Sequence, residues 1–399
     1  MNGLNKKMKK KILFINGHLN TGGVEKSLAD ILRKIDLNKF DVKLLLLEDY
    51  GDYINQIPKN VKIELFDLHN TYGSLLKSLT NCLKQRDKKC FWTRIVFFLT
   101  RWFGRDKLRW LGKTIFKNEE YDCVIGFRPG IATELAAYAV TAKRKITWWH
   151  HGEMNLNIQQ KKDYENACKK MDYVVSVSEG CANFLKKEIL GIDKKLYIIP
   201  NMLDIENIIK KSEEYKPFEK NKEIIDFVTV GRLSPEKHVE NAIKVAWKLE
   251  ENAKEKFRWF IVGDGSERNK LQNMIDGYGL ERQVVLVGSK ENPYPYMKNA
   301  DFLVHTSYVE SQCLAVLEAM ALGIPCIVTK SIGINEFAMD GYNCFMVEQN
   351  EVALENTILK TIQQKLDVVK ISKNGINTAK NFSEDKIISR IETIFENIE

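Results

Sequence analysis

The 399-residue sequence has no pair of cysteines at C-x-x-C spacing, no apolar run of membrane-spanning length, and no repeat or low-complexity tract. Because a helix needs about 18 apolar residues to cross a bilayer, we expect no transmembrane helix. The missing repeats exclude a solenoid. The eight cysteines stand singly, several within apolar runs, so we expect reduced core thiols in a reducing compartment.

The composition is that of an ordinary soluble enzyme, with 44% hydrophobic and 29% charged residues. A chain of this length favours two domains. The net charge of +8 is compatible with phosphates, nucleic acid or an anionic membrane, and selects none of them. Lysines precede the apolar run KILFING near the start, but that run is short and His18 follows, so we expect a β-strand and not a signal peptide.

Apolar runs of strand length alternate with segments of helical periodicity, which predicts parallel strands joined by crossover helices. These runs are 12–16, 42–48, 123–127, 146–149, 173–178, 197–200, 224–231, 259–263, 284–288, 301–307 and 325–329. We interpret the charged stretch 205–223 as a linker. The predicted fold class is therefore α/β, with two doubly wound Rossmann-like domains over 1–204 and 205–380, and an amphipathic C-terminal helix over 381–399 that packs on the body.

Polar loops follow the predicted strands of the second half. Arg232 and Lys237 flank a turn that opens a helix, which suits a diphosphate. From this loop alone, two solvated surface cations are an equally good interpretation. The later GDGSER loop has Arg268 where a dinucleotide fingerprint needs a third glycine, so it is weak evidence for NAD.

Two carboxylates, Glu310 and Glu318, flank the start of a largely apolar helix predicted over about 312–322. An internal carboxylate on such a helix is costly unless it meets donors, and sugar and ribose hydroxyls are suitable donors. The alternative is an acid that favours the helix dipole plus one exposed glutamate. The neighbouring Arg232 and Lys237 favour the ligand-binding interpretation.

Together these segments resemble the retaining glycosyltransferases of family four, which have the GT-B architecture. The resemblance lies in VGRLSPEKH, FIVGDGSE, ADFLVHTSYVESQCLAVLEAMALGIPCIVT, GINEFAMDGYNCFMV, NTGGVEKSL, WHHG and DYVVSVSEG, and spans about 11–395. It implies transfer of a sugar, with retention, from a nucleotide diphosphate sugar such as a UDP-sugar to an acceptor hydroxyl. It implies no cofactor. No D-x-D metal motif is present, so we expect no metal.

The resemblance also implies roles for matching positions. The implied catalytic residues are Arg232 and Lys237 at the diphosphate, Glu310 at the donor sugar, and His151 facing that sugar from the first domain. The implied donor-binding residues are Gly22, Gly23, Arg232, Lys237, Ser289, Lys290, Cys313, Leu314 and Glu318. Within this set, Glu318 would bind the ribose, and Ser289 and Lys290 the base. For His150 we expect a packed side chain.

Two positions depart from the family, which often has glycine where Cys313 and Ile332 stand. Both add a side chain near the donor, so they bear on donor identity more than on the chemistry.

Segment 84–117 is the most unusual in the chain, with eleven Lys or Arg, two Asp and eight aromatic residues. This composition favours an anionic membrane surface. Nucleic acid, which we do not expect, and a helical pair with a basic outer face are the alternatives. A lipid-linked saccharide acceptor in bacterial surface-polysaccharide synthesis, such as capsule assembly, would fit. We then expect a cytoplasmic protein, peripheral at the inner face of the plasma membrane.

Two other functions stay open. One is a nucleotide-sugar epimerase or phosphorylase of the same fold. The other is a non-catalytic, basic protein that binds membrane or nucleic acid.

Overall fold

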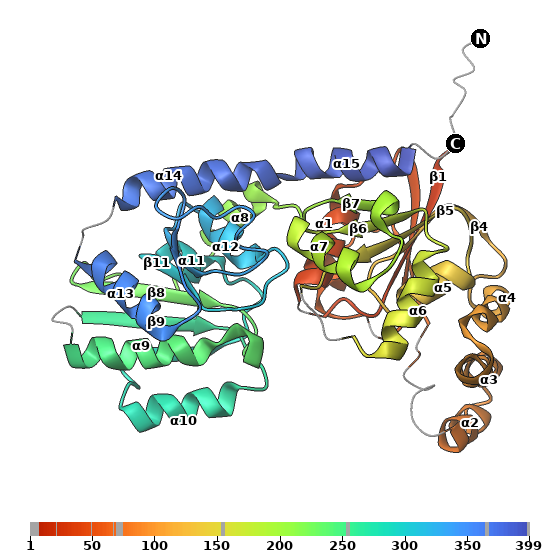
Figure 1. Cartoon of the computed structure of the whole chain (residues 1–399), viewed down its shortest axis with the longest axis horizontal. Coiled ribbons are helices and arrows are strands. Elements are labelled where there is room, and N and C mark those ends of the chain that lie inside the picture. Colours follow the sequence, from red (N-terminus) through yellow and green to blue (C-terminus); the bar gives the residue numbers. More distant parts are fainter. Residues whose placement is uncertain are drawn as a thin grey trace, which may run out of the picture. The chain divides into compact units, whose positions relative to one another are not determined.

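The computed structural model describes residues 8–20, 22–48, 50–66, 68, 75–152, 156–252, 256–363 and 367–396. The chain divides into two compact units (Figure 1): unit 1 is Met1–Pro200 with Ile388–Glu399, and unit 2 is Asn201–Ile387. Each unit is built on one parallel sheet with helices against it. The predicted fold class of two Rossmann-like α/β domains is confirmed. Among the described helices, none is both long and apolar enough to cross a membrane.

Unit 1 has a seven-stranded parallel sheet in the order β3-β2-β1-β4-β5-β6-β7. Its strands are β1 Lys10–Asn16, β2 Phe40–Leu46, β3 Lys62–Leu65, β4 Glu120–Gly126, β5 Thr141–Trp149, β6 Tyr173–Ser176 and β7 Leu196–Ile198. Ile12 of β1 pairs with Val42 on one side and Cys123 on the other. The strand order reverses between β1 and β4, which is where ligands of such sheets bind.

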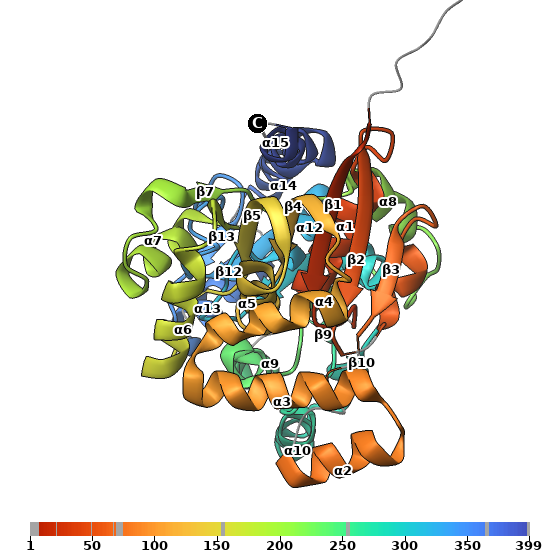
Figure 2. The same ribbon diagram turned by 90° about the vertical axis from the view of Figure 1, so that its right-hand side faces the viewer.

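The helices of unit 1 follow the strands. They are α1 Gly23–Lys34, α2 Leu75–Lys84, α3 Lys88–Phe103, α4 Gly112–Ile115, α5 Ile131–Tyr138, α6 Ile158–Cys168 and α7 Glu179–Glu188, with 3-10 turns η1 Asp52–Gln56, η3 Arg105–Leu111 and η4 Asp193–Lys195. Figure 2 shows α2 and α3 side by side at the margin of the unit.

The expectation of eight reduced cysteines is wrong for two of them. Cys82 of α2 and Cys90 of α3 form a disulfide. The short turn between the two helices brings the Cα atoms of Cys82 and Cys90 to within 5.8 Å of each other. These cysteines are eight residues apart in the sequence, so a search for C-x-x-C spacing does not find them. The other six cysteines are free and buried.

Unit 2 has a six-stranded parallel sheet in the order β10-β9-β8-β11-β12-β13. Its strands are β8 Ile224–Val230, β9 Lys256–Val262, β10 Val284–Gly288, β11 Phe302–His305, β12 Cys326–Thr329 and β13 Phe345–Val347. Its helices are α8 Ile205–Ser212, α9 Val239–Asn252, α10 Arg268–Tyr278, α11 Tyr294–Asn299, α12 Leu314–Ala321, α13 Glu351–Ile362 and α14 Val368–Ala379, with turns η5 Pro235–Lys237 and η6 Lys380–Phe382.

The stretch 205–223 is not simply a linker. Its first part forms α8, which belongs to unit 2 and buries Ile208 in that unit's core. The apolar residues at 205, 208 and 209 have helical spacing, but the many charged residues around them obscure this pattern in the sequence.

The last helix, α15 Glu384–Glu396, ends within unit 1. There the ring of Phe395 packs edge-on against Phe14 and Phe40, with centroids 6.1 and 5.9 Å away. Glu392 accepts a hydrogen bond from the backbone N–H of Asp36 at 2.8 Å. Phe395 of α15 is therefore part of the core of unit 1.

Candidate functional site

The candidate site of unit 2 lies at the carboxyl edge of its sheet. Because all six strands are parallel, the loops after β8, β9, β11 and β12 leave the sheet at the same edge. The first two of these loops are bonded to each other: Leu233 N–H donates to the Asp264 carbonyl, and Glu267 N–H to the Leu233 carbonyl, both at 2.9 Å.

The two glycines of GDGSER serve this contact between loops. A Cβ on Gly263 would lie 1.8 Å from the Gly231 carbonyl oxygen, and one on Gly265 would lie 2.3 Å from the Leu233 oxygen. Glycine is therefore required for close packing. This explains the motif without a dinucleotide.

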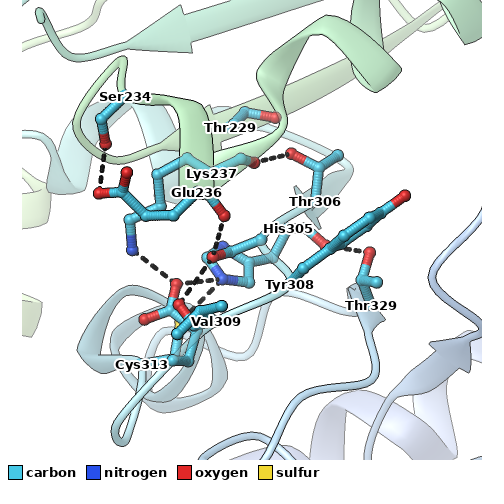
Figure 3. Close-up of polar contacts among 12 residues, drawn as sticks. Thr229, Ser234, Glu236, Lys237, His305, Thr306, Tyr308, Val309, Cys313 and Thr329 are labelled. Atoms are coloured by element: carbon cyan, nitrogen blue, oxygen red, sulfur yellow. Dashed lines mark hydrogen bonds and ion pairs between the residues drawn. The ribbon is translucent and has the colours of Figure 1, made fainter. Parts of the chain in front are cut away.

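Lys237 and Glu310 form the centre of the site, and Figure 3 shows Lys237 close to His305. Nζ of Lys237 lies 2.6 Å from Oε1 of Glu310. His305, the last residue of β11, places its Nε2 2.8 Å from the same oxygen. The side chains of Lys237 and Glu310 are 21% and 9% exposed, so the pair is mostly withdrawn from water but reachable from it. The loops after β8 and β11 are thus joined by an ion pair.

The charge state of this pair follows from its surroundings. Burial by itself raises the pKa of Glu310, but the ammonium of Lys237 and the hydrogen bond with His305 outweigh burial and lower that pKa to about 2. Burial lowers the pKa of Lys237, and the Glu310 carboxylate outweighs it, so the net direction is upward. Both groups are therefore charged at neutral pH.

His305, Glu310 and Cys313 each offer a ligand atom within 4.8 Å of the others, a spacing that a metal ion could use. The residues fit a metal poorly. The carboxylate is already matched by the Lys237 ammonium, which would repel a divalent cation. Burial also raises the pKa of the Cys313 thiol well above its usual value, so the thiolate that binds metals is disfavoured.

The backbone of the Lys237 loop is hydrogen-bonded to the segment after β11. Thr306 Oγ1 donates to the Lys237 carbonyl at 2.8 Å, and Ser307 Oγ donates to the Glu236 carbonyl at 3.0 Å. The ring of Tyr308 stacks on His238 with centroids 3.9 Å apart. His238 has a left-handed φ of 45°, which these contacts help to maintain. Lys237 is therefore fixed from its backbone as well as by Glu310.

The other predicted residues of unit 2 are spread along the same edge. Arg232 is exposed in the Lys237 loop, and Ser289 and Lys290 are exposed just after β10. Leu314 is the first residue of α12. Cys313 is the N-cap of α12, with φ 57°, and its side chain makes no capping hydrogen bond. The first turn of α12 is thus not capped by Cys313.

Glu318 lies inside α12 and is 6% exposed. Tyr294, the first residue of α11, donates its hydroxyl to Glu318 Oε1 at 3.2 Å. The structure thus gives this buried carboxylate at least one donor. The interpretation of Glu318 as an exposed helical residue is wrong.

The predicted residues of unit 1 lie after two of its strands. Gly22 is the N-cap of α1 and Gly23 its first residue. His151 follows β5 and is half-buried, and its carbonyl accepts a hydrogen bond from the Trp149 indole at 2.5 Å. The ring of His150 packs 4.5 Å from that of Phe127 and the residue is 5% exposed, as expected for a packed side chain.

Sequence reasoning missed a second polar cluster, at the point where the strand order of unit 1 reverses. Arg128, just after β4, places Nη1 3.3 Å from Oε1 of buried Glu25 and 3.4 Å from Nε2 of His18. It also missed His305 and Tyr308 in unit 2. A histidine at the end of an apolar strand was the available signal for His305. No local pattern links His18, Glu25 and Arg128, which are brought together by the sheet.

Comparison with known proteins gives one family match. Residues 210–381 match the family described as "Glycosyl transferases group 1". An uncharacterized glycosyltransferase of Methanocaldococcus jannaschii is 32% identical over 236 residues, which cover 58% of this chain and 59% of that protein. The UDP-Gal:alpha-D-GlcNAc-diphosphoundecaprenol alpha-1,3-galactosyltransferase of Escherichia coli is 29% identical over 217 residues, 52% of this chain and 56% of that protein. The chain thus spans less than two thirds of these curated relatives.

Solved structures resemble the whole chain. The HepE protein of Anabaena, crystallised with UDP and glucose, aligns with a TM-score of 0.73 and 19% identity over 97% of this chain and 99% of that one. At this identity the likeness shows the fold, which both chains share over nearly their full length.

Proposed function

We propose that this protein is a retaining glycosyltransferase, because residues 210–381 match the group 1 glycosyltransferase family. It moves a sugar from a nucleotide diphosphate sugar, a UDP-sugar, to an acceptor hydroxyl. The observation that carries the proposal is the ion pair between Lys237 and Glu310, with exposed Arg232 in the same loop. A cation for the diphosphate and a carboxylate for sugar hydroxyls stand side by side.

The leaving group is the nucleotide diphosphate, whose charge grows as the anomeric bond breaks. Arg232 and Lys237 supply fixed positive charge there, and the first turn of α12 supplies backbone N–H groups beside Cys313 and Leu314. Glu236 keeps its own charge: burial raises its pKa, but the hydrogen bond from Ser234 and nearby cations outweigh this and lower it. The negative charge of Glu236 therefore reduces the net positive charge of the loop.

The carboxylates recognise the two ends of the donor. Glu310 accepts hydrogen bonds from hydroxyls of the transferred sugar, and Glu318 from the ribose. Ser289 and Lys290, beyond β10, contact the base. Ionised Glu310, with its pKa of about 2, accepts hydrogen bonds throughout the physiological range. Glu310→Gln should therefore lower sugar transfer much more than UDP affinity, and the reverse result would contradict its assignment.

Transfer proceeds on one face of the sugar. The bond from the anomeric carbon to the diphosphate oxygen breaks, and the acceptor oxygen bonds to that carbon on the same side. The departing phosphate oxygen takes the acceptor's proton, so no protein base is needed. No metal takes part, because Arg232, Lys237 and the helix dipole stabilise the leaving group.

The acceptor belongs to unit 1. Within unit 1, Gly22 and Gly23 at the start of α1 leave the backbone open to a ligand, and His151 follows β5. The acceptor we propose is a lipid-linked saccharide in bacterial surface-polysaccharide synthesis, such as capsule assembly. Its support is that a relative's name specifies a diphosphoundecaprenol substrate.

A lipid-linked acceptor implies a cytoplasmic protein that binds the inner face of the plasma membrane. Segment 84–117 would make that contact with anionic lipid, and no nucleic acid is involved. The support is its charge: eleven cations against two aspartates exceed the chain's whole net charge of +8. Flotation of the purified protein with anionic vesicles tests the proposal, and protein that stays at the bottom of the gradient contradicts it.

A thermal-shift screen over nucleotide sugars, with UDP alone as reference, tests donor binding, because a ligand of the native state raises its melting temperature. The donor found in this way is then used to measure UDP release. Release that depends on an added acceptor supports transfer. Sugar interconversion without UDP release would favour an epimerase, and no stabilisation by any nucleotide sugar would favour a non-catalytic protein.

A further inference from the structure

Helix α3 presents several bulky apolar side chains to the outside of unit 1, while Phe97 packs against the core. Its buried side chains are Cys90, Thr93, Val96 and Thr100, of which two are polar and all are small or medium-sized. Trp102 is 72% exposed, Phe103 65%, and Trp92 and Phe98 39% each. This reverses the usual arrangement, in which the large apolar residues of a surface helix face the core.

The exposed side chains form a strip with helical spacing. Trp92, Phe98, Trp102 and Phe103 fall on one face of α3, within about 140° of one another at about 100° per residue. The partly exposed Phe91, Ile95 and Leu99 lie on the same face. Trp110 in η3, 40% exposed, adds a further ring. We call Trp92, Phe98, Trp102, Phe103 and Trp110 the aromatic strip. Exposed aromatic surface of this extent indicates an interaction site.

Cations surround the strip. Lys88, Lys89, Arg101 and Arg109 are exposed, and among the described residues no acid forms an ion pair with any of the four. The two acids of the segment are already engaged. Asp87 caps α3 by accepting from the Cys90 N–H, and Asp106 pairs with Lys107 at 2.8 Å. The surface therefore has uncompensated positive charge around an aromatic centre.

The segment is firmly attached to unit 1 behind this surface. Arg105 points inward, with its Nη2 3.0 Å from Asp163 and its Nη1 3.4 Å from Glu134. Leu108 and Leu111 of η3 are fully buried in the same core as Val96. The segment that carries the aromatic strip is thus attached to the core of unit 1 by ion pairs and buried side chains.

We propose that α3 and η3 insert the aromatic strip into the interface of an anionic lipid bilayer, with the surrounding cations at the headgroups. The biological role of this insertion rests on the proposed function, since membrane binding would bring the chain to a lipid-linked acceptor. Its physical basis is independent: rings at headgroup depth bury apolar surface, and Lys and Arg attract anionic lipid.

Vesicle binding tests the proposal with three variants of the full chain. The double variant Trp102→Ser/Phe103→Ser removes the two most exposed rings and should weaken binding to phosphatidylglycerol-containing vesicles at least about tenfold. The triple variant Lys88→Gln/Lys89→Gln/Arg101→Gln should weaken it about fivefold for each cation. The matched control, Ile158→Ser/Leu190→Ser, removes two apolar residues of unit 1 that are 89% and 75% exposed, and should bind like the native chain.

Insertion is separated from surface adsorption by tryptophan fluorescence. Three of the seven tryptophans lie in the aromatic strip. Brominated lipids should therefore quench the native protein, and Trp102→Phe, which keeps an apolar ring, should retain binding and lose much of the quenching. High salt should weaken binding but not abolish it, because the aromatic part is not screened.

Several results would overturn the proposal. Native-like binding by Trp102→Ser/Phe103→Ser would mean electrostatic adsorption without insertion. Binding to single-stranded RNA but not to vesicles would assign the strip to nucleic acid, and a dimer that this double variant dissociates would assign it to a second copy. The thermal shift caused by UDP should be unchanged in all three variants. If the native chain does not bind vesicles but still shows the UDP shift, the membrane surface alone is refuted. If the native chain binds vesicles but does not bind UDP, the proposed function alone is refuted.

Discussion

Replacing Lys237 with methionine should destabilise unit 2 through the charge it leaves behind. Methionine keeps most of the unbranched stem and removes the ammonium that lies 2.6 Å from Glu310. The Glu310 carboxylate, 9% exposed, would then retain only His305 as its charged or polar partner in this contact. Breaking a buried pair on one side is strongly destabilising because the remaining charge is uncompensated.

The magnitude follows from the pKa of Glu310. Its reduction from 4.5 to about 2 corresponds to about 3 kcal/mol of stability at neutral pH. This agrees with the range of about 3–5 kcal/mol for breaking one side of a buried ion pair. We therefore expect Lys237→Met to lower the free energy of unfolding at pH 7 by about 3 kcal/mol.

The sign of the pH dependence is a further check. In the native chain the pKa of Glu310 is lowered, so its stabilising contribution is complete above about pH 4.5 and is lost as pH falls toward 2. In Lys237→Met, burial dominates and raises that pKa, so the variant gains stability as pH falls from 7 toward 5. The difference between the two proteins should narrow over this interval.

Urea unfolding at pH 7 and pH 5, followed by circular dichroism, measures both effects. Glu310→Gln and the double variant Lys237→Met/Glu310→Gln complete a mutant cycle, and the double variant should lose less than the sum of the single losses. A loss below about 1 kcal/mol for Lys237→Met at pH 7, the value of an exposed pair, would refute the reasoning. So would strictly additive single losses.

The remaining predictions concern single residues. Arg232→Ala should lower UDP release by about 10²–10³-fold without changing the melting temperature, because Arg232 is exposed; a parallel loss of stability would point to a structural role. Glu318→Gln should weaken UDP binding about tenfold by calorimetry, since a charge-assisted hydrogen bond is lost, and unchanged affinity would remove the ribose assignment. Gly333→Ala should lower the free energy of unfolding by about 1–3 kcal/mol, because its Cβ would lie 2.4 Å from the Ser311 carbonyl carbon. Gly277→Ala, in open space on α10, is its control and should be neutral or slightly stabilising.

The strand pattern was the most legible part of the sequence. Runs such as 12–16 and 224–231 are apolar because strands buried on both faces contact helices on each side. Two edge strands, β3 and β13, were not predicted. Lys62–Leu65 is polar and partly exposed, and Phe345–Val347 has only three residues.

The candidate site was predicted in part, because its motif residues follow strand ends. Glu310 and Lys237 are 73 residues apart, and their placement after two neighbouring parallel strands brings them to one edge. His305 was missed because a single histidine at the end of an apolar strand is a weak signal. The disulfide between Cys82 and Cys90 was missed because it depends on how two helices pack.

The sequence by itself determined the α/β alternation, the division into two domains of parallel strands, and the residue types after each strand end, since these depend on local periodicity and on turn chemistry. Only the tertiary structure decided which of those residues meet, that Glu318 is buried against Tyr294, and that four rings of α3 face outward. Contacts between distant segments depend on sheet order and helix orientation, and composition cannot distinguish an aromatic residue that fills a core from one that faces solvent.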